Sequence, residues 1–157
     1  MSLPTGVPAT TAQPPKIYRA MKSDPEDRLP VVGAGSSAEL GVRPGVDITV
    51  DVVGNVVLDA SGMSVAPRWQ NLPFSRIPRR LRDIVPGAAG ADTTACFSLG
   101  AGPFRKGIVA DGLELIPDRG QHAPVHGVIA PAHVVPLAQY QTNLANTRAD
   151  WRIDERP

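Results

Sequence analysis

Four side chains of this sequence have the types that chemistry on an anionic ligand requires: Arg19, Ser64, Glu114 and His126. A guanidinium can grip an anion with a bidentate fork, and a hydroxyl and its amide can position a ligand. A carboxylate can stabilise a developing positive charge, and an imidazole can serve as a hydrogen-bond donor or general acid near neutral pH. Because these residues are spread along the chain, they form one site only if separate elements bring them together.

Arg19 lies in a short run, residues 16–21, that predicts a β-strand. If Ile17 faces the core, strand alternation places Arg19 on the same face. An inward guanidinium needs a partner, because an unpaired buried charge is costly. That partner is either an anionic ligand or a carboxylate of the chain, such as Asp47.

Ser64 follows Gly62, where a residue without a Cβ allows a close backbone approach. A serine without a neighbouring base is a poor nucleophile, so Ser64 is predicted to position a ligand rather than to attack it. His126 either assists proton transfer or satisfies local backbone groups. Glu114 alternates with apolar Leu113 and Leu115, a pattern that favours the solvent side of a strand over a catalytic position.

Two further groups carry charge or metal-ligand chemistry. The stretch Arg76–Arg82 holds four arginines, which either bind phosphate or form a solvated face paired with acids, and we favour the second interpretation. The spacing of His122, His126 and His133 is not that of a helical zinc pair. We therefore predict no metal site.

The elements that position these residues are mostly short strands and turns. Residues 47–59 predict a hairpin around Gly54-Asn55, and residues 108–116 predict a second hairpin with Asp111-Gly112 in a type I′ turn. We expect a further strand at residues 125–129. Helices are expected at residues 36–40, at residues 78–85, and from Pro136 onward, where Leu137, Tyr140, Leu144 and Trp151 share one helical face.

Composition limits the class of protein. The 157 residues are enough for one domain with a core, and 17 Pro and 15 Gly favour many turns. A net charge of +1 gives no drive toward nucleic acid or an anionic membrane. No apolar run approaches the roughly 20 residues that span a bilayer, and the start lacks the pattern of a secretory signal. We expect an extended arm at residues 1–15, a single α+β domain at residues 16–157, and a cytoplasmic location.

Four motifs, in this order, resemble the Tse2-like branch of ADP-ribosyltransferase-fold toxins. They are Tyr18-Arg19-Ala20, Gly62-Met63-Ser64-Val65, His126–Pro131 and Pro136–Gln141. The resemblance implies a compact α+β fold with a bent or split β core and few helices. It also implies a cleft that binds nicotinamide adenine dinucleotide (NAD) as a substrate.

By the same resemblance, Arg19 contacts the dinucleotide, with Tyr18, Gly62 and Ser64 lining the cofactor site and Ser64 shaping the nicotinamide end. A glutamate promotes transfer in this fold, and Glu114 is the candidate here. The implied activity is transfer of the ADP-ribosyl group to a target macromolecule or to water by a bacterial toxin or effector. Delivery into another cell without a cleaved signal is the alternative to a purely cytoplasmic location. Such a toxin implies an immunity or antitoxin partner.

Two other interpretations compete with this one. The chain is alternatively a non-enzymatic binding module that uses Arg76–Arg82 or the proline-rich arm, or a structural protein that oligomerises. In the enzyme, Arg19→Ala is expected to abolish turnover of the dinucleotide with little loss of thermal stability.

Overall fold

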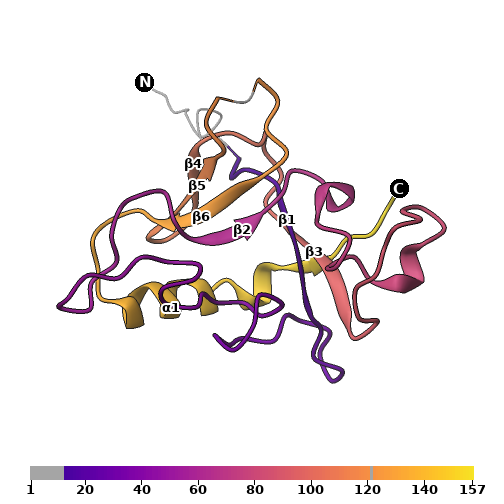
Figure 1. The fold of residues 1–157 in the computed structure, drawn as a ribbon, viewed down its shortest axis with the longest axis horizontal. Coiled ribbons are helices and arrows are strands. Elements are labelled where there is room, and N and C mark those ends of the chain that lie inside the picture. The colour runs from indigo at the N-terminus through magenta and orange to yellow at the C-terminus, as the bar shows by residue number, and fades with distance from the viewer. Residues whose placement is uncertain (1–12, 121) are drawn as a thin grey trace, which may run out of the picture.

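The structure is a computed structural model that describes residues 13–120 and 122–157. Within that part of the chain, short strands form two antiparallel sheets, accompanied by one α-helix and several 3-10 turns (Figure 1). The fold is therefore α+β with few helices. Its elements are β1 (Ile17–Lys22), β2 (Met63–Val65), β3 (Thr94–Leu99), β4 (Gly107–Ala110), β5 (Leu113–Pro117), β6 (Gly127–Pro131), α1 (Leu137–Ala145) and β7 (Arg152–Ile153), with 3-10 helices at Trp69–Asn71, Arg79–Leu81 and Arg148–Asp150.

The three-stranded sheet has the order β1-β3-β7, with Arg19 of β1 opposite Phe97 of β3. The predicted first strand is confirmed. All six residues of β3 are buried, as expected of a central strand that is covered on both faces. Such a strand has no alternation of apolar and polar residues, which is why the sequence offers little signal for it.

The four-stranded sheet has the order β2-β6-β5-β4. The predicted hairpin at Asp111-Gly112 is confirmed as β4–β5, with a shift of register between Ile108 and Ala110. The predicted type I′ turn is wrong, because Gly112 has a φ of 73° while Asp111 is not among the residues with positive φ. Of the two central residues, Gly112 alone takes the left-handed conformation, and a register shift next to the turn accompanies it.

The two sheets meet at a single antiparallel bridge between Tyr18 and Ala66. The amide of each residue donates to the carbonyl of the other, at 2.8 and 2.9 Å. This bridge joins β1 to the end of β2, and we call it the seam. Arg19 follows Tyr18 directly, so the seam determines what surrounds its side chain.

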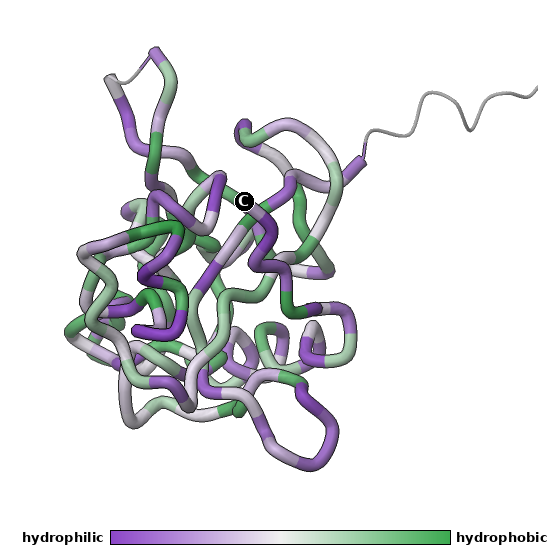
Figure 2. The backbone as a smooth tube through the Cα atoms, turned by 90° about the vertical axis from the view of Figure 1, so that its right-hand side faces the viewer, coloured by the Kyte–Doolittle hydropathy of each residue, from purple (hydrophilic) through white to green (hydrophobic). Residues whose placement is uncertain are grey.

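Strand β1 separates two apolar cores. Ile17 and Met21 belong to the larger core, whereas Ala20 and the half-buried Tyr18 belong to a smaller one around Trp69. By alternation Arg19 shares the face of Ile17 and Met21, as predicted. Figure 2 shows apolar and polar residues interleaved along the coloured part of the trace, so the cores are assembled from many short apolar segments.

Helix α1 confirms the predicted C-terminal helix. Tyr140 and Leu144 are fully buried, and the helix contacts β5 beneath the four-stranded sheet in the view of Figure 1. The hydroxyl of Tyr140 donates to the carbonyl of Ile129 in β6. Trp151 is also buried but lies past the helix end, so its predicted place on the same helical face is wrong.

The segment between β1 and β2 differs most from expectation. The helix predicted at residues 36–40 is absent, because side-chain oxygens of Ser36 and Glu39 accept backbone amides and close turns instead. The hairpin predicted at residues 47–59 is reduced to one bridge, between Val50 and Val56. The turn is centred on Val52-Val53 instead of Gly54-Asn55, with the Gly54 amide donating to the Asp51 carbonyl at 3.1 Å. The Asp51 carboxylate supports this turn by accepting the amides of Val53 and Asn55.

Two other predictions hold in part. The helix predicted at residues 78–85 shrinks to the 3-10 turn Arg79–Leu81, and the strand predicted at residues 125–129 begins later, as β6. Residues 1–12 of the predicted arm lie outside the described residues. Its last residues dock on the sheet region, where the Pro14 carbonyl accepts the amides of Ala101 and Gly102 at 3.1 and 2.7 Å.

Candidate functional site

A pocket of about 210 Å³ opens beside the seam. It lies where β1 and β2 diverge and where the segment that connects them folds back. Its polar lining includes three arginines, one carboxylate, two serines, an asparagine and a histidine. The residues around it are Arg19, Ala20, Ser37, Arg43, Asp47, Ser64, Val65, Ala66, Asn71, Leu72, Pro73, Arg76 and His126.

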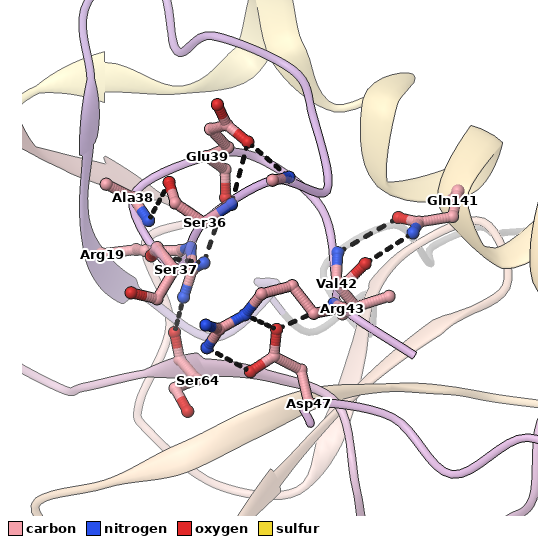
Figure 3. A network of polar contacts seen from close by, with 11 residues as sticks. Arg19, Ser36, Ser37, Ala38, Glu39, Val42, Arg43, Asp47, Ser64 and Gln141 are labelled. Carbon is pink, nitrogen blue, oxygen red and sulfur yellow. Dashed lines mark hydrogen bonds and ion pairs between the residues drawn. The ribbon is translucent and has the colours of Figure 1, made fainter. Parts of the chain in front are cut away.

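Arg19 donates only to backbone carbonyls (Figure 3). Its Nη1 donates to the carbonyl of Ser64 at 2.8 Å, and its Nη2 donates to those of Ser37 at 2.8 Å and Glu39 at 3.0 Å. The sequence predicted that an anionic ligand or a carboxylate such as Asp47 would be the partner of Arg19. Its hydrogen-bond partners are instead backbone carbonyls of the chain. Arg19 fastens β1 to β2 and to the connecting segment.

The charge of Arg19 is nevertheless only partly compensated. The residue is 6% exposed, and its Nε has no hydrogen-bond partner among the described residues. Burial lowers the pKa of Arg19 to about 10; the carboxylate of Asp47 opposes this shift, and the positive charge of Arg76 adds to it. Arg19 still carries a full positive charge at neutral pH, held beside the pocket.

Asp47 is paired with Arg43. Its Oδ2 accepts from Nε and from the backbone amide of Arg43 at 3.0 and 2.8 Å, and its Oδ1 accepts from Nη2 at 3.2 Å. Burial alone would raise the pKa of Asp47, but these hydrogen bonds outweigh it and keep the pKa below its ordinary value. The pocket thus contains an ionised carboxylate that one arginine already occupies.

The connecting segment is braced from both ends. The Gln141 side chain of α1 accepts the amide of Val42 at 3.1 Å and donates to its carbonyl at 2.7 Å (Figure 3). A Cβ at Gly41 would lie 2.1 Å from the carbonyl oxygen of Gly33, so this close approach requires glycine. Oε1 of Glu39 accepts the amides of Gly35 and Ser36. The wall that carries Arg43 is therefore held both by local contacts and by Gln141, which is distant in sequence.

Ser64 and His126 complete the polar lining. Ser64 is exposed on β2 and uses its carbonyl, not its hydroxyl, to accept Arg19, so the hydroxyl stays available. His126 lies just before β6, with Nδ1 at 2.9 and 3.1 Å from the two carboxylate oxygens of Asp118. This contact orients the ring and gives it a negatively charged neighbour.

The other predicted site residues lie elsewhere. Glu114 lines a separate pocket of about 550 Å³, together with Asp59, Lys106 and Arg119. The Tyr18 hydroxyl donates to Asp154 at 3.1 Å. At Gly62 a Cβ would lie 2.4 Å from the carbonyl oxygen of Ile129. The close approach that this glycine allows is therefore to strand β6 of the same chain.

The basic stretch Arg76–Arg82 does not form one surface. Arg80 pairs with Glu155 at 2.6 and 2.7 Å, which confirms the predicted pairing with an acid for this arginine. The Nε of Arg82 donates to the carbonyl of Ala88 at 2.8 Å. Arg76 instead lines the pocket at the seam. Its role there was not foreseeable from sequence, because nothing in the local pattern separates it from its neighbours.

Three further features concern metal binding, the single thiol and membrane spans. Among residues 13–120 and 122–157, no group of three or more His, Cys, Asp or Glu side chains could hold a metal ion. Burial raises the pKa of the Cys96 thiol to about 12, so this buried thiol stays protonated at neutral pH. None of the helices in the described part of the chain is long and apolar enough to cross a membrane.

Comparisons with protein-family models, with curated proteins and with solved structures found no match.

Proposed function

We propose that the pocket at the seam binds NAD and that the chain is an ADP-ribosyltransferase-like toxin or effector. The reaction breaks the bond between nicotinamide and ribose and passes the ADP-ribosyl group to a target macromolecule or to water. One observation carries the proposal: Arg19, Ser64 and His126, which come from separate parts of the sequence, line the same pocket. Like other toxins of this kind, the chain would need a neutralising partner in the producing cell.

The charge of the pocket favours an anionic ligand. Arg19, Arg43 and Arg76 contribute three positive charges, whereas Asp47 contributes one negative charge. Guanidinium groups match the geometry of phosphate oxygens, so a diphosphate suits this lining. The pocket is smaller than the roughly 300 Å³ at which sites for drug-sized ligands begin. It would therefore hold one portion of a dinucleotide, with the remainder at its mouth.

The catalytic contribution would be electrostatic. Positive charge develops on the ribose as the glycosidic bond breaks, and preorganised groups of opposite charge stabilise it. Three arginines disfavour that charge, so Asp47 and the Asp118–His126 pair are the groups that would stabilise it. Ser64 would position the nicotinamide end. Glu114 has no part in this arrangement, because it lines the other pocket.

The test is direct detection of nicotinamide released from NAD by the purified protein. Ser64→Ala and His126→Ala are suitable variants because both side chains are exposed and neither supports the core. We expect each to reduce release at least about tenfold, equivalent to about 1.4 kcal/mol. His133→Ala is the matched control, because His133 is exposed and lies outside the pocket.

Two results would overturn the proposal. One is the absence of both nicotinamide release and a thermal shift at about 1 mM NAD, a concentration at which even weak sites fill. The other is full activity in both pocket variants. Growth arrest on expression in a bacterium, relieved by His126→Ala but not by His133→Ala, would add support.

A further inference from the structure

The three arginines of the pocket differ in what their guanidinium groups already bind. Both terminal nitrogens of Arg19 are taken by backbone carbonyls, and Arg43 is held by Asp47. Arg76 is half-buried and lines the pocket, and its guanidinium makes no hydrogen bond or ion pair with any described residue. Its donors are therefore the ones that remain for a ligand.

The lining of the pocket carries more positive than negative charge. The charges of Arg76 and Arg43 both lower the pKa of Arg19, so each of them repels the Arg19 guanidinium. Asp47 is the single carboxylate in the lining, and it is engaged by Arg43. A bound anion would relieve this repulsion, and a doubly charged one would balance the lining.

The backbone of Arg76 is firmly placed. Its amide donates to the carbonyl of Pro73 at 2.8 Å, and the next residue, Ile77, is fully buried. Gly90 packs directly against it, since a Cβ there would lie 2.6 Å from the carbonyl carbon and oxygen of Arg76. A long, free side chain on a rigid base is well suited to reach into a site and bind a ligand.

We infer that Arg76, rather than Arg19, makes the direct contact with a phosphate group of the ligand. Arg19 is a positioning residue, which holds the wall of the pocket and adds charge to it. The ligand class is a phosphate-bearing anion, recognised by the planar fork of the Arg76 guanidinium. The inference depends on the proposed function only for the identity of the ligand beyond its phosphate group.

The test is a calorimetric titration of the whole chain with inorganic pyrophosphate at low salt. We expect binding by the natural protein and a loss of at least about tenfold in affinity for Arg76→Gln, the scale of one charge-assisted contact. Arg79→Gln is the matched control, because Arg79 is exposed, lies three residues away and is not in the pocket lining. It is expected to bind within about twofold of the natural protein.

A second variant separates charge from geometry. Arg76→Lys keeps the positive charge but loses the fork, so it should bind more weakly than the natural protein and more tightly than Arg76→Gln. No measurable binding by the natural protein, equal losses in Arg76→Gln and Arg79→Gln, or unchanged binding by Arg76→Gln would each overturn the inference.

The same variants, assayed with NAD, distinguish the two proposals. If pyrophosphate binding depends on Arg76 but no nicotinamide is released, the inference stands and the proposed function fails. If Arg76→Gln releases nicotinamide as fast as the natural protein at limiting NAD, the proposed function stands and the inference fails.

Discussion

Two clusters of charge lie on either side of β1, and they are built in opposite ways. The first, which we call the C-terminal clamp, consists of Asp154 and Glu155 with their partners. Asp154 is 5% exposed and accepts from the hydroxyls of Tyr18 and Ser98 at 3.1 and 3.0 Å. It also pairs with Lys16 and Arg156, both at 3.1 Å. Every oxygen of this buried carboxylate has a partner.

Glu155 continues the clamp along the edge of the three-stranded sheet. Its Oε2 accepts the amide of Cys96 at 3.0 Å, in β3 beyond the short ladder with β7. The same carboxylate holds Arg80 through both of its oxygens. In the clamp, both carboxylates are fully engaged, because Lys16, Arg80 and Arg156 pair with them.

The pocket at the seam lacks such complete pairing. It gathers three guanidiniums around one carboxylate, and it leaves the donors of Arg76 without a partner among the described residues. A buried charge is costly unless it is paired. Charged groups that are paired with one another, as in the clamp, stabilise the fold. A charged group that lies beside a cavity without a partner is where a ligand is expected.

The largest effect is expected from opening the clamp. Asp154→Ala would strand the buried hydroxyl of Ser98 and the charge of Lys16, so we expect a loss of about 4 kcal/mol in the free energy of unfolding. Chemical denaturation at neutral pH measures this loss. A change below about 1 kcal/mol, the scale of an exposed ion pair, would show that the clamp is not structural.

The clamp also predicts a dependence on pH. Burial alone would raise the pKa of Asp154, but hydrogen bonds from Arg156, Lys16, Ser98 and Tyr18 outweigh it and hold the pKa well below its ordinary value. The stabilisation is therefore complete above the unfolded pKa of about 3.9 and is lost as the pH falls below that value toward the folded pKa. The stability difference between the natural protein and Asp154→Ala should shrink in that acid range, as followed by urea unfolding.

A smaller loss is expected at the seam. Arg19→Ala removes three hydrogen bonds to carbonyls and should cost about 3 kcal/mol in the free energy of unfolding. This differs from the expectation from sequence that the substitution leaves stability almost unchanged. Ser64→Ala is the control: the acceptor is the backbone carbonyl of Ser64, so this variant should unfold like the natural protein. Equal stability of Arg19→Ala and Ser64→Ala would contradict the tethering role.

The smallest effects on stability are expected for two arginines of the same basic stretch, and they should differ between the two. Arg80→Gln should cost about 1 kcal/mol, because its pair with Glu155 is bidentate but partly exposed. Arg76→Gln should change stability by less than about 0.5 kcal/mol, since it breaks no contact within the described chain. Thermal melting at low and high salt measures both. A loss in Arg76→Gln as large as that in Arg80→Gln would mean that Arg76 is part of the architecture.

Local patterns were enough to predict several elements. The strand β1, the hairpin β4–β5 and the helix α1 follow from periodicity and turn residues, which act over a few neighbours. The failures at residues 36–40 and 47–59 have one cause: side-chain oxygens of Ser36, Glu39 and Asp51 accept nearby amides and compete with regular backbone pairing. Whether a side-chain oxygen can reach a nearby amide depends on the backbone conformation that the segment has already adopted.

The candidate site was predicted less completely. Residue types and motif order selected Arg19, Ser64 and His126, which line one pocket, but also Glu114, which lines another. Arg43 and Arg76 carried no distinguishing signal. Arg43 reaches the pocket because the segment between β1 and β2, which has no helix or strand, folds back against β1, whereas Arg76 comes from the turns that follow β2.

The amino-acid sequence alone determined the α+β class, the inward face of Arg19 and the apolar stripe of α1, because each depends on the repeat of a single element. Tertiary packing decides which carbonyls Arg19 binds and that Asp47 pairs with Arg43. It also decides that no other described residue binds the guanidinium of Arg76. Those outcomes depend on groups far apart in sequence meeting in a medium of low dielectric, where the balance of charge is settled by the whole fold.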